Sequence, residues 1–142
     1  MTDHGGTMSV GAADAALDQR LDAELTAFNN AATGADDYGA ISVKVTDDRG
    51  DLVGGLTAWT WGGLCGIKMM WVREDARHQG WGAKILAALE AEARRRGCDR
   101  VAVASFTFQA PGFYQRYGYR ETGRMLGIPG GHADIHMFKH LS

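Results

Sequence analysis

The sequence predicts an α/β fold in which a mixed, mostly antiparallel central sheet is flanked by helices. Between residues 41 and 72, three apolar or alternating segments are separated by hairpin turn residues, and segments with helical periodicity precede and follow them. A chain of 142 residues with 45% hydrophobic and 23% charged residues suits one globular domain. We therefore expect a single domain over residues 12–142, after a disordered tail over residues 1–11 that is rich in Gly, Thr and Ser.

The first helix is predicted from residue 13 to a stop between Asn30 and Gly34. Its apolar residues recur every three or four positions, at Ala13, Leu17, Leu21, Leu25 and Phe28. Such an apolar stripe needs a sheet to cover it.

Three antiparallel strands are predicted next. Ile41, Val43 and Val45 alternate with polar residues and lead into an Asp-Asp-Arg-Gly-Asp turn at residues 47–51. The second strand covers residues 52–61, and Gly62-Gly63 turns it into a third strand over residues 64–72. The third strand is largely apolar, which predicts a central position in the sheet.

The second half of the chain returns to helical periodicity and then to strands. A helix over residues 80–96 carries Ile85, Leu86, Leu89 and Ala93 on one face and ends at Gly97. A strand over residues 100–105 follows, as a right-handed crossover that makes it parallel to the strand over residues 64–72. After a short helix that ends at Gly118, strands over residues 119–126 and 134–139 complete the sheet.

Gly80 and Gly82, at the start of the long helix, indicate an anionic ligand. The first N–H groups of a helix have no intrahelical acceptor, and glycine lets a phosphate approach the backbone. Arg77 and Lys84 add positive charge nearby. A dinucleotide or Walker loop fits poorly, because the third glycine and the Gly-Lys-Ser/Thr ending are both absent.

Two motifs in order resemble the GNAT superfamily of acyl-CoA-dependent N-acetyltransferases. The first is Arg77-His78-Gln79-Gly80-Trp81-Gly82, after a strand and before a helix; the second is Phe113-Tyr114-Gln115-Arg116-Tyr117-Gly118-Tyr119. The resemblance covers roughly residues 41–139, and residues 105–114 are similar to one uncharacterised bacterial branch. It implies a GNAT-like sheet whose splayed strand pair, ending at Val72 and at Ser105, holds CoA. No strand is predicted before the first helix, in contrast to the usual family plan, so the acceptor side is expected to be built differently.

The resemblance also implies which residues contact the cofactor. Backbone N–H groups from Gln79 to Ala83 would hold the pyrophosphate, and the chain at 70–72 would pair with the pantetheine arm and supply an N–H to the oxyanion. The implied cofactor-binding residues are Met70, Trp71, Val72, Arg77, His78, Gln79, Gly80, Trp81, Gly82, Ala83, Thr107 and Tyr114. Thr107 stands where many relatives carry an asparagine that contacts the cofactor.

Tyr114 is the implied catalytic residue. By position alone it suits the core, but the matching tyrosine of the family protonates the leaving thiolate, which a phenol of pKa about 10 can do. The base that deprotonates the amine is not identified. Glu74 and Glu121 are candidates, although each also suits a solvated surface charge. Lys68, where the similar branch tends to carry aspartate, is a candidate substrate-binding residue or a lysine that extends to solvent.

Other reactive side chains have simpler interpretations. His132 and His136 are four residues apart in a loop and a strand, too far apart to share one ion, so we expect no metal. Cys65 as a nucleophile would need an activating histidine, and a buried core residue is the default. Trp59, Trp61 and Trp71 would line an acceptor pocket or a dimer face, or pack in the core.

These observations lead to an N-acetyltransferase with acetyl-CoA as co-substrate and a small-molecule amine as acceptor. The alternative is a non-catalytic acyl-CoA-binding sensor or regulatory module, and a nucleotide-binding regulator is the third reading. A net charge of -2 and a pI near 6.2 give no reason to expect nucleic acid as partner. With no apolar signal segment or membrane span we expect no membrane partner and a cytoplasmic protein. Formation of a homodimer is a further possibility.

Overall fold

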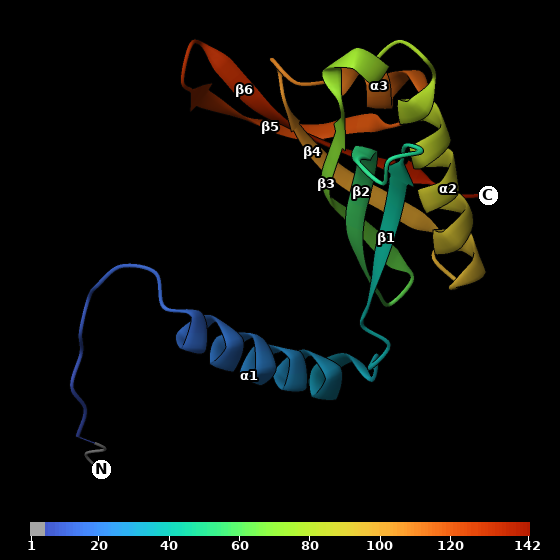
Figure 1. Cartoon of the computed structure of the whole chain (residues 1–142). Coiled ribbons are helices and arrows are strands. Elements are labelled where there is room, and N and C mark those ends of the chain that lie inside the picture. Colours follow the sequence, from blue (N-terminus) through green and yellow to red (C-terminus); the bar gives the residue numbers. More distant parts are fainter. Residues whose placement is uncertain (1–4) are drawn as a thin grey trace. The chain divides into compact units, whose positions relative to one another are not determined.

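The structure, a computed structural model, describes residues 5–142 (Figure 1). The chain divides into two compact units, one ending at Ala35 and one over Asp36–Ser142. Residues 5–14 contain neither helix nor strand. The predicted tail over residues 1–11 falls partly on residues 1–4, which lie outside the described residues, and the tail and the single domain over 12–142 stay predictions.

In the first unit, helix α1 spans Ala15–Thr33, as its periodicity predicts. Asp14 caps its start by accepting a 3.0 Å hydrogen bond from the N–H of Leu17, and Gly34 ends it in the left-handed conformation. No residue of α1 is buried. The packing expected for its apolar stripe therefore stays a prediction.

The second unit is built on a six-stranded sheet with the order β1-β2-β3-β4-β6-β5. Its strands are β1 (Gly39–Thr46), β2 (Leu52–Trp61), β3 (Leu64–Val72), β4 (Arg100–Phe106), β5 (Arg120–Ile128) and β6 (His132–His140). All neighbouring pairs are antiparallel except β3 and β4. The mixed, mostly antiparallel sheet is confirmed, as are the predicted β1 to β3 meander and the parallel crossover.

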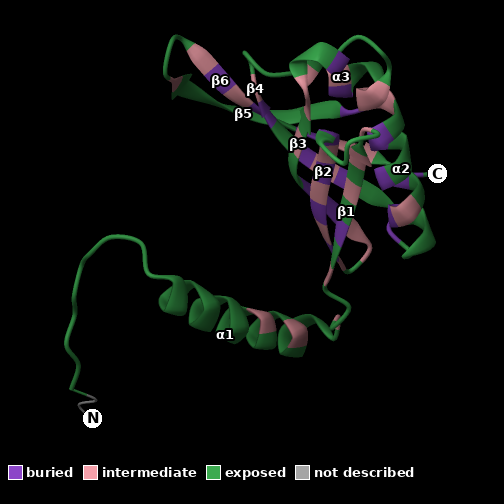
Figure 2. Ribbon diagram, in the orientation of Figure 1, coloured by how far each residue is buried: buried purple, intermediate pink, exposed green. Residues whose placement is uncertain are grey.

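Helices α2 (Trp81–Arg95) and α3 (Pro111–Arg116) and the 3-10 turn η1 (Glu74–Ala76) follow the strands. Buried residues of α2 and α3 join those of the sheet in one hydrophobic cluster (Figure 2). In β2, residues that face this cluster alternate with half-buried ones: Leu56, Ala58 and Thr60 are buried, whereas Thr57, Trp59 and Trp61 are not. The cluster face and the opposite face of the sheet are thus distinct.

Within the described residues, no helix is both long enough and apolar enough to cross a bilayer.

Candidate active site

The site begins where β3 and β4 separate. Their parallel pairing joins Leu64 to Arg100, Cys65 to Val101 and Gly66 to Ala102, and it extends no further. Both strands continue beyond it, β3 to Val72 and β4 to Phe106. The sheet is therefore open between the two strand ends, and backbone groups on the inner edge of β3 are available to a bound chain.

A bulge in β3 lies at this opening. The register with β2 pairs Ala58 with Ile67 and Thr57 with Met69, so Lys68 is the extra residue. An extra residue disrupts the ladder and turns the strand locally. The bulge thus adds to the divergence of β3 from β4.

Helix α2 begins beside the end of β3. Gly80 precedes it at φ 83°, and the first bond into the helix runs from the N–H of Lys84 to the carbonyl of Gly80 at 3.1 Å. The N–H groups of Trp81, Gly82 and Ala83 therefore have no intrahelical acceptor. The ammonium of Lys84 lies 4.8 Å from the centre of the Trp81 ring, which keeps a cation at this helix start.

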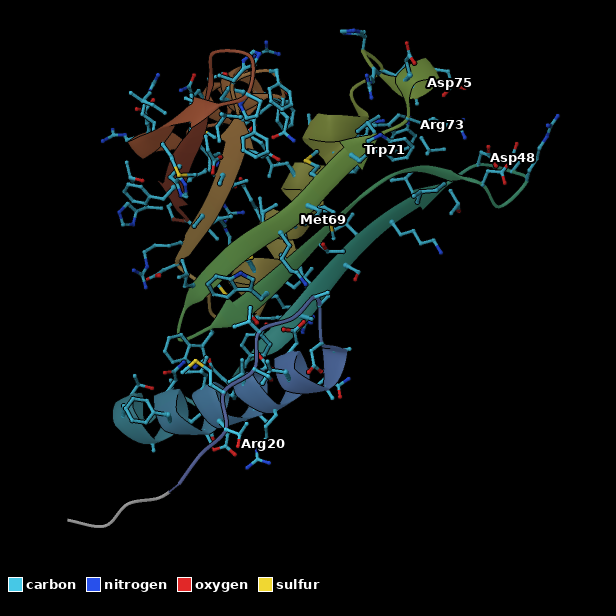
Figure 3. The ribbon with its side chains drawn as sticks, turned by 90° about the vertical axis from the view of Figure 1, so that its left-hand side faces the viewer. Arg20, Asp48, Met69, Trp71, Arg73 and Asp75 are labelled. Atoms are coloured by element: carbon cyan, nitrogen blue, oxygen red, sulfur yellow. The ribbon has the colours of Figure 1, made fainter. Side chains whose placement is uncertain are left out.

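Hydrogen bonds hold the loop between β3 and α2. The Nε of Arg77 donates to the carbonyl of Val72 at 2.9 Å, and the amide of Gln79 donates to the carbonyl of Asp75 at 3.2 Å. Arg73 was missed by the sequence reasoning: it pairs with Asp75 at 2.6 Å, close beyond the end of β3 (Figure 3), and with Asp47 of the β1–β2 turn at 3.2 Å. The pair with Asp47 joins residues 26 positions apart and leaves no pattern in the sequence.

Gly82 brings three elements together. A Cβ on Gly82 would lie 3.1 Å from Cε1 of Phe113 in α3 and 3.7 Å from Cε of Met70 in β3. The glycine therefore lets the start of α2 approach both neighbours. Phe113 contacts Tyr114 edge to face, with ring centres 5.2 Å apart.

Tyr114 lies at this junction with only 6% of its surface exposed. Its hydroxyl donates to Sδ of Met70 at 3.5 Å. Burial raises the pKa of Tyr114 above the ordinary value of 10. The phenol is thus protonated at neutral pH, and it lies next to the strand that borders the opening.

The structure does not bring every predicted cofactor residue to this junction. The hydroxyl of Thr107 is 2.8 Å from Nδ1 of His132 and accepts from the N–H of Ala133 at 3.2 Å, so it is engaged with β6. Trp71 lies near the end of β3 (Figure 3), and 48% of its surface is exposed, so we assign only its backbone to the inner edge of β3. The cofactor roles of these residues stay predictions.

The candidate bases lie apart from one another. Glu74 is exposed in η1, whereas Glu121 in β5 pairs with Arg124 at 2.6 Å. The hydrogen bond from Arg124 lowers the pKa of Glu121, which makes it a weaker base. Lys68 is exposed at the bulge. Its proposed contact with substrate stays a prediction.

The other reactive residues are a histidine with an acidic neighbour and two buried cysteines. His136 lies 3.3 Å from Asp134, and among the described residues no cluster of three His, Cys, Asp or Glu side chains could hold a metal ion. Cys65 and Cys98 are both buried and free. Burial raises the pKa of Cys65 to about 11, so its thiol is a poor nucleophile.

The chain matches one family model and has relatives among known proteins. A family model described as the acetyltransferase (GNAT) domain matches residues 39–121. The blasticidin-S acetyltransferase of Streptomyces morookaense is 39% identical over 98 residues, which cover 66% of this chain and 70% of that protein. The acetyltransferase Atu2258 of Agrobacterium fabrum is 31% identical over 121 residues, covering 85% of this chain and 88% of that protein.

The fold is also found among solved structures. A 1.9 Å crystal structure of an acetyltransferase from Bacillus cereus ATCC 14579 superposes with a TM-score of 0.82 at 28% identity, covering 94% of this chain and 98% of that one. The arrangement of strands and helices around the opening is therefore similar to that of acetyltransferases of this kind.

Proposed function

The chain belongs to the GNAT acetyltransferase family, and from this premise we propose that it moves an acetyl group from acetyl-CoA to a primary amine by direct attack in a ternary complex. As an acyl-CoA N-acyltransferase it needs a place for the thioester, a place for the amine and an acid for the leaving thiolate. The observation that carries the proposal is the protonated Tyr114 hydroxyl, 3.5 Å from Met70 at the edge of the open strand pair.

The cofactor would run from the start of α2 to the opening between β3 and β4. The free N–H groups of Trp81, Gly82 and Ala83 suit a pyrophosphate, because a helix start carries partial positive charge. Lys84 and the terminal nitrogens of Arg77 can add to this attraction. The edge of β3 that β4 leaves open over residues 70–72 suits the amide groups of pantetheine, which would extend the sheet as a strand does, although the carbonyl of Val72 already accepts from Arg77.

Transfer then requires one attack and one proton. The neutral amine nitrogen attacks the thioester carbonyl carbon, a C–N bond forms, and the carbonyl oxygen carries negative charge that a backbone N–H near residues 70–72 would stabilise. As the C–S bond breaks, the Tyr114 hydroxyl gives its proton to the thiolate, which yields CoA and the amide. The acceptor's ammonium loses one proton to a base or to water before the attack, the nitrogen loses a second after the C–N bond has formed, and the tyrosinate is reprotonated.

We place this reaction in the cytoplasm with a small-molecule amine as acceptor. The relative from Streptomyces morookaense is named for the acetylation of blasticidin-S, which supports a small-molecule acceptor here. Two buried, free thiols support a reducing compartment.

The test is an amine-library screen with acetyl-CoA in which acetylated products are identified by mass spectrometry. Release of CoA alone is an insufficient readout, because slow hydrolysis would also produce it. Acetylation of at least one amine, lost in Tyr114→Phe, is the expected result. Tight acetyl-CoA binding with no acetylated product from any class of amine would instead favour the sensor function.

A further inference from the structure

Four residues form a row across the sheet on the face opposite the hydrophobic cluster. Trp59 pairs with Gly66, Gly66 with Ala102, and Ala102 with Phe138. Directly paired residues point to the same face of a sheet, so two large rings flank two very small residues. The row is a shallow trough with aromatic walls.

The Trp59 ring lies over Gly66 and covers that end of the row. A Cβ added to Gly66 would lie 2.2 Å from Cε2 of the indole, so the ring rests on the bare backbone of β3. On the other side, the ring of Phe138 contacts His140 edge to face at 5.0 Å. Trp59 and Phe138 are both half-buried, which leaves part of each ring accessible.

A cavity of about 280 Å³ lies over this floor, and Ala104, Thr122 and His136 extend its lining beyond Ala102. Ligand pockets commonly have volumes of about 300–1,000 Å³, so this open hollow is at the small end of that range and has room for one ring system against its floor. Its open floor is at Ala102, beside the indole that covers Gly66, and planar aromatic groups gain from contact with rings of this kind.

The position of the cavity relates it to the proposed reaction. Gly66 and Ala102 are the last pair before β3 and β4 separate, so the cavity lies at the narrow end of the opening. Gly66 is four residues from Met70, roughly 13 Å along the strand at ~3.3 Å per residue. Ala104 and His136, which pair with each other, also line the cavity and extend it from Ala102 toward the open strand ends. Ala104 lies two residues beyond Ala102 on the parallel strand, so this end of the cavity is roughly 7 Å from the level of Met70 at ~3.3 Å per residue, and an amine on an arm attached to a ring held there would extend toward the opening.

Polar groups of both signs surround the trough. The imidazole of His136 is 55% exposed, and its Nε2 lies 3.3 Å from Oδ2 of Asp134, which is 16% exposed. Arg120 pairs directly with Phe138, so charges of both signs surround the trough, and the apolar surface carries the recognition of a ligand.

We propose that this trough binds the aromatic or heteroaromatic ring of the acceptor, so that the preferred substrates are amines joined by a short arm to a flat ring. The proposal rests on the proposed function. It assigns Trp59 to acceptor binding in place of core packing or a dimer face.

A matched pair of amines tests the proposal without any variant. We would measure kcat/KM with saturating acetyl-CoA for 2-phenylethylamine and 2-cyclohexylethylamine, which share carbon skeleton and amine but differ in planarity. The aromatic amine is expected to be about tenfold better, mainly through a lower KM. Equal values for the two amines would overturn the proposal.

Variants then locate the effect. Trp59→Leu should bring the two amines to within about twofold of each other, whereas Trp61→Leu, on the same strand and face but outside the cavity lining, should keep the tenfold preference. Circular dichroism would verify that both variants fold. An unchanged preference in folded Trp59→Leu would also overturn the proposal.

A binding measurement separates this inference from the proposed function. If no amine is acetylated, calorimetry on the CoA-saturated protein would compare the affinities of the same two amines. Tighter binding of the aromatic amine that depends on Trp59 would support the trough although the enzyme proposal fails. Acetylation of aliphatic amines without any aromatic preference would retain the enzyme and overturn the trough.

Discussion

The hydroxyl of Tyr119 donates a 2.9 Å hydrogen bond to Oε2 of Glu90, a carboxylate that lies buried on α2. The ammonium of Lys139 on β6 completes the group, 2.9 Å from Oε1 of the same carboxylate. The Tyr119 ring in turn contacts the Tyr114 ring edge to face, with centres 5.6 Å apart. This network ties α2 and β6 together directly behind the proposed catalytic phenol.

Tyr119→Phe removes the hydroxyl and keeps the ring. We expect the free energy of unfolding to fall by about 1–3 kcal/mol, because a buried carboxylate loses a hydrogen-bond donor. Urea denaturation measures this change. Glu90→Gln serves as the stronger disruption, about 3 kcal/mol, since it leaves Lys139 without its partner. A Tyr119→Phe protein as stable as the parent would show that the bond contributes nothing.

The same residue gives the stability a dependence on alkaline pH. Burial, reinforced by the charge of Glu90, raises the pKa of Tyr119 above its ordinary value of 10. The folded protein therefore holds this proton more tightly than the unfolded chain. The contribution to stability is complete below pH ~10 and is lost as the pH rises above it. Denaturation curves at increasing pH should show a smaller alkaline loss in Tyr119→Phe than in the parent.

Tyr114→Phe tests the proposed acid. We expect turnover to fall by roughly 10²-fold, with acetyl-CoA affinity nearly unchanged, because the hydroxyl acts only as the thiolate leaves. Burial raises the pKa of Tyr114, so the parent enzyme should keep its acid protonated up to at least pH ~10. Single-turnover kinetics would isolate the chemical step. An unaltered rate of that step in the variant would remove Tyr114 from the mechanism.

Gly82→Val tests the cofactor position at the start of α2. A valine side chain would press on Phe113, where even a Cβ comes within 3.1 Å, and would project beside the free N–H groups. We expect acetyl-CoA affinity to fall by at least about tenfold as measured by calorimetry. Gly123→Val is the matched control, because nothing lies within 4 Å of a Cβ there. Unchanged affinity in a folded Gly82→Val protein would show that the cofactor binds elsewhere.

Local patterns were sufficient to predict the sheet and its helices. The alternation at Ile41, Val43 and Val45 and the glycines at 62–63 and 97 are properties of neighbouring residues, and the structure confirms the elements they predict. The GNAT fold and the mostly antiparallel sheet also agree with the family and with solved relatives.

Longer-range features could not be predicted in the same way. Glu90 finds its partners 29 and 49 residues away, and nothing in the pattern of α2 distinguishes this carboxylate from a solvated one. The early end of the β3–β4 pairing and the bulge at Lys68 depend on register, which the apolar composition of β3 does not specify. The row of residues from Trp59 to Phe138 depends on the same register, so the sequence alone did not predict it.

The thiols provide a test of burial. Because the pKa of Cys65 is raised to about 11, roughly one molecule in a thousand carries the thiolate at pH 8. We expect Ellman's reagent to label neither buried cysteine rapidly in the native protein and to label both after unfolding. Cys65→Ala should retain full turnover. Rapid labelling of native Cys65, or loss of activity in a folded Cys65→Ala protein, would point to a reactive thiol.

Lys68 provides the last test, because the bulge exposes a cation beside the opening between β3 and β4. A positive charge near the acyl-transfer position repels acceptors with a second ammonium group and attracts acceptors with a carboxylate. We expect Lys68→Asp to raise kcat/KM for diamines and lower it for amino-acid-like amines, each by about threefold, since an exposed charge pair contributes up to about 1 kcal/mol. Lys68→Met removes the charge without reversing it, so its kcat/KM for each kind of amine should lie between those of the parent and of Lys68→Asp. Raising the salt concentration should reduce all of these differences. If diamines are the best substrates of the parent protein and both variants leave that ranking unchanged, Lys68 extends to solvent and does not select the acceptor.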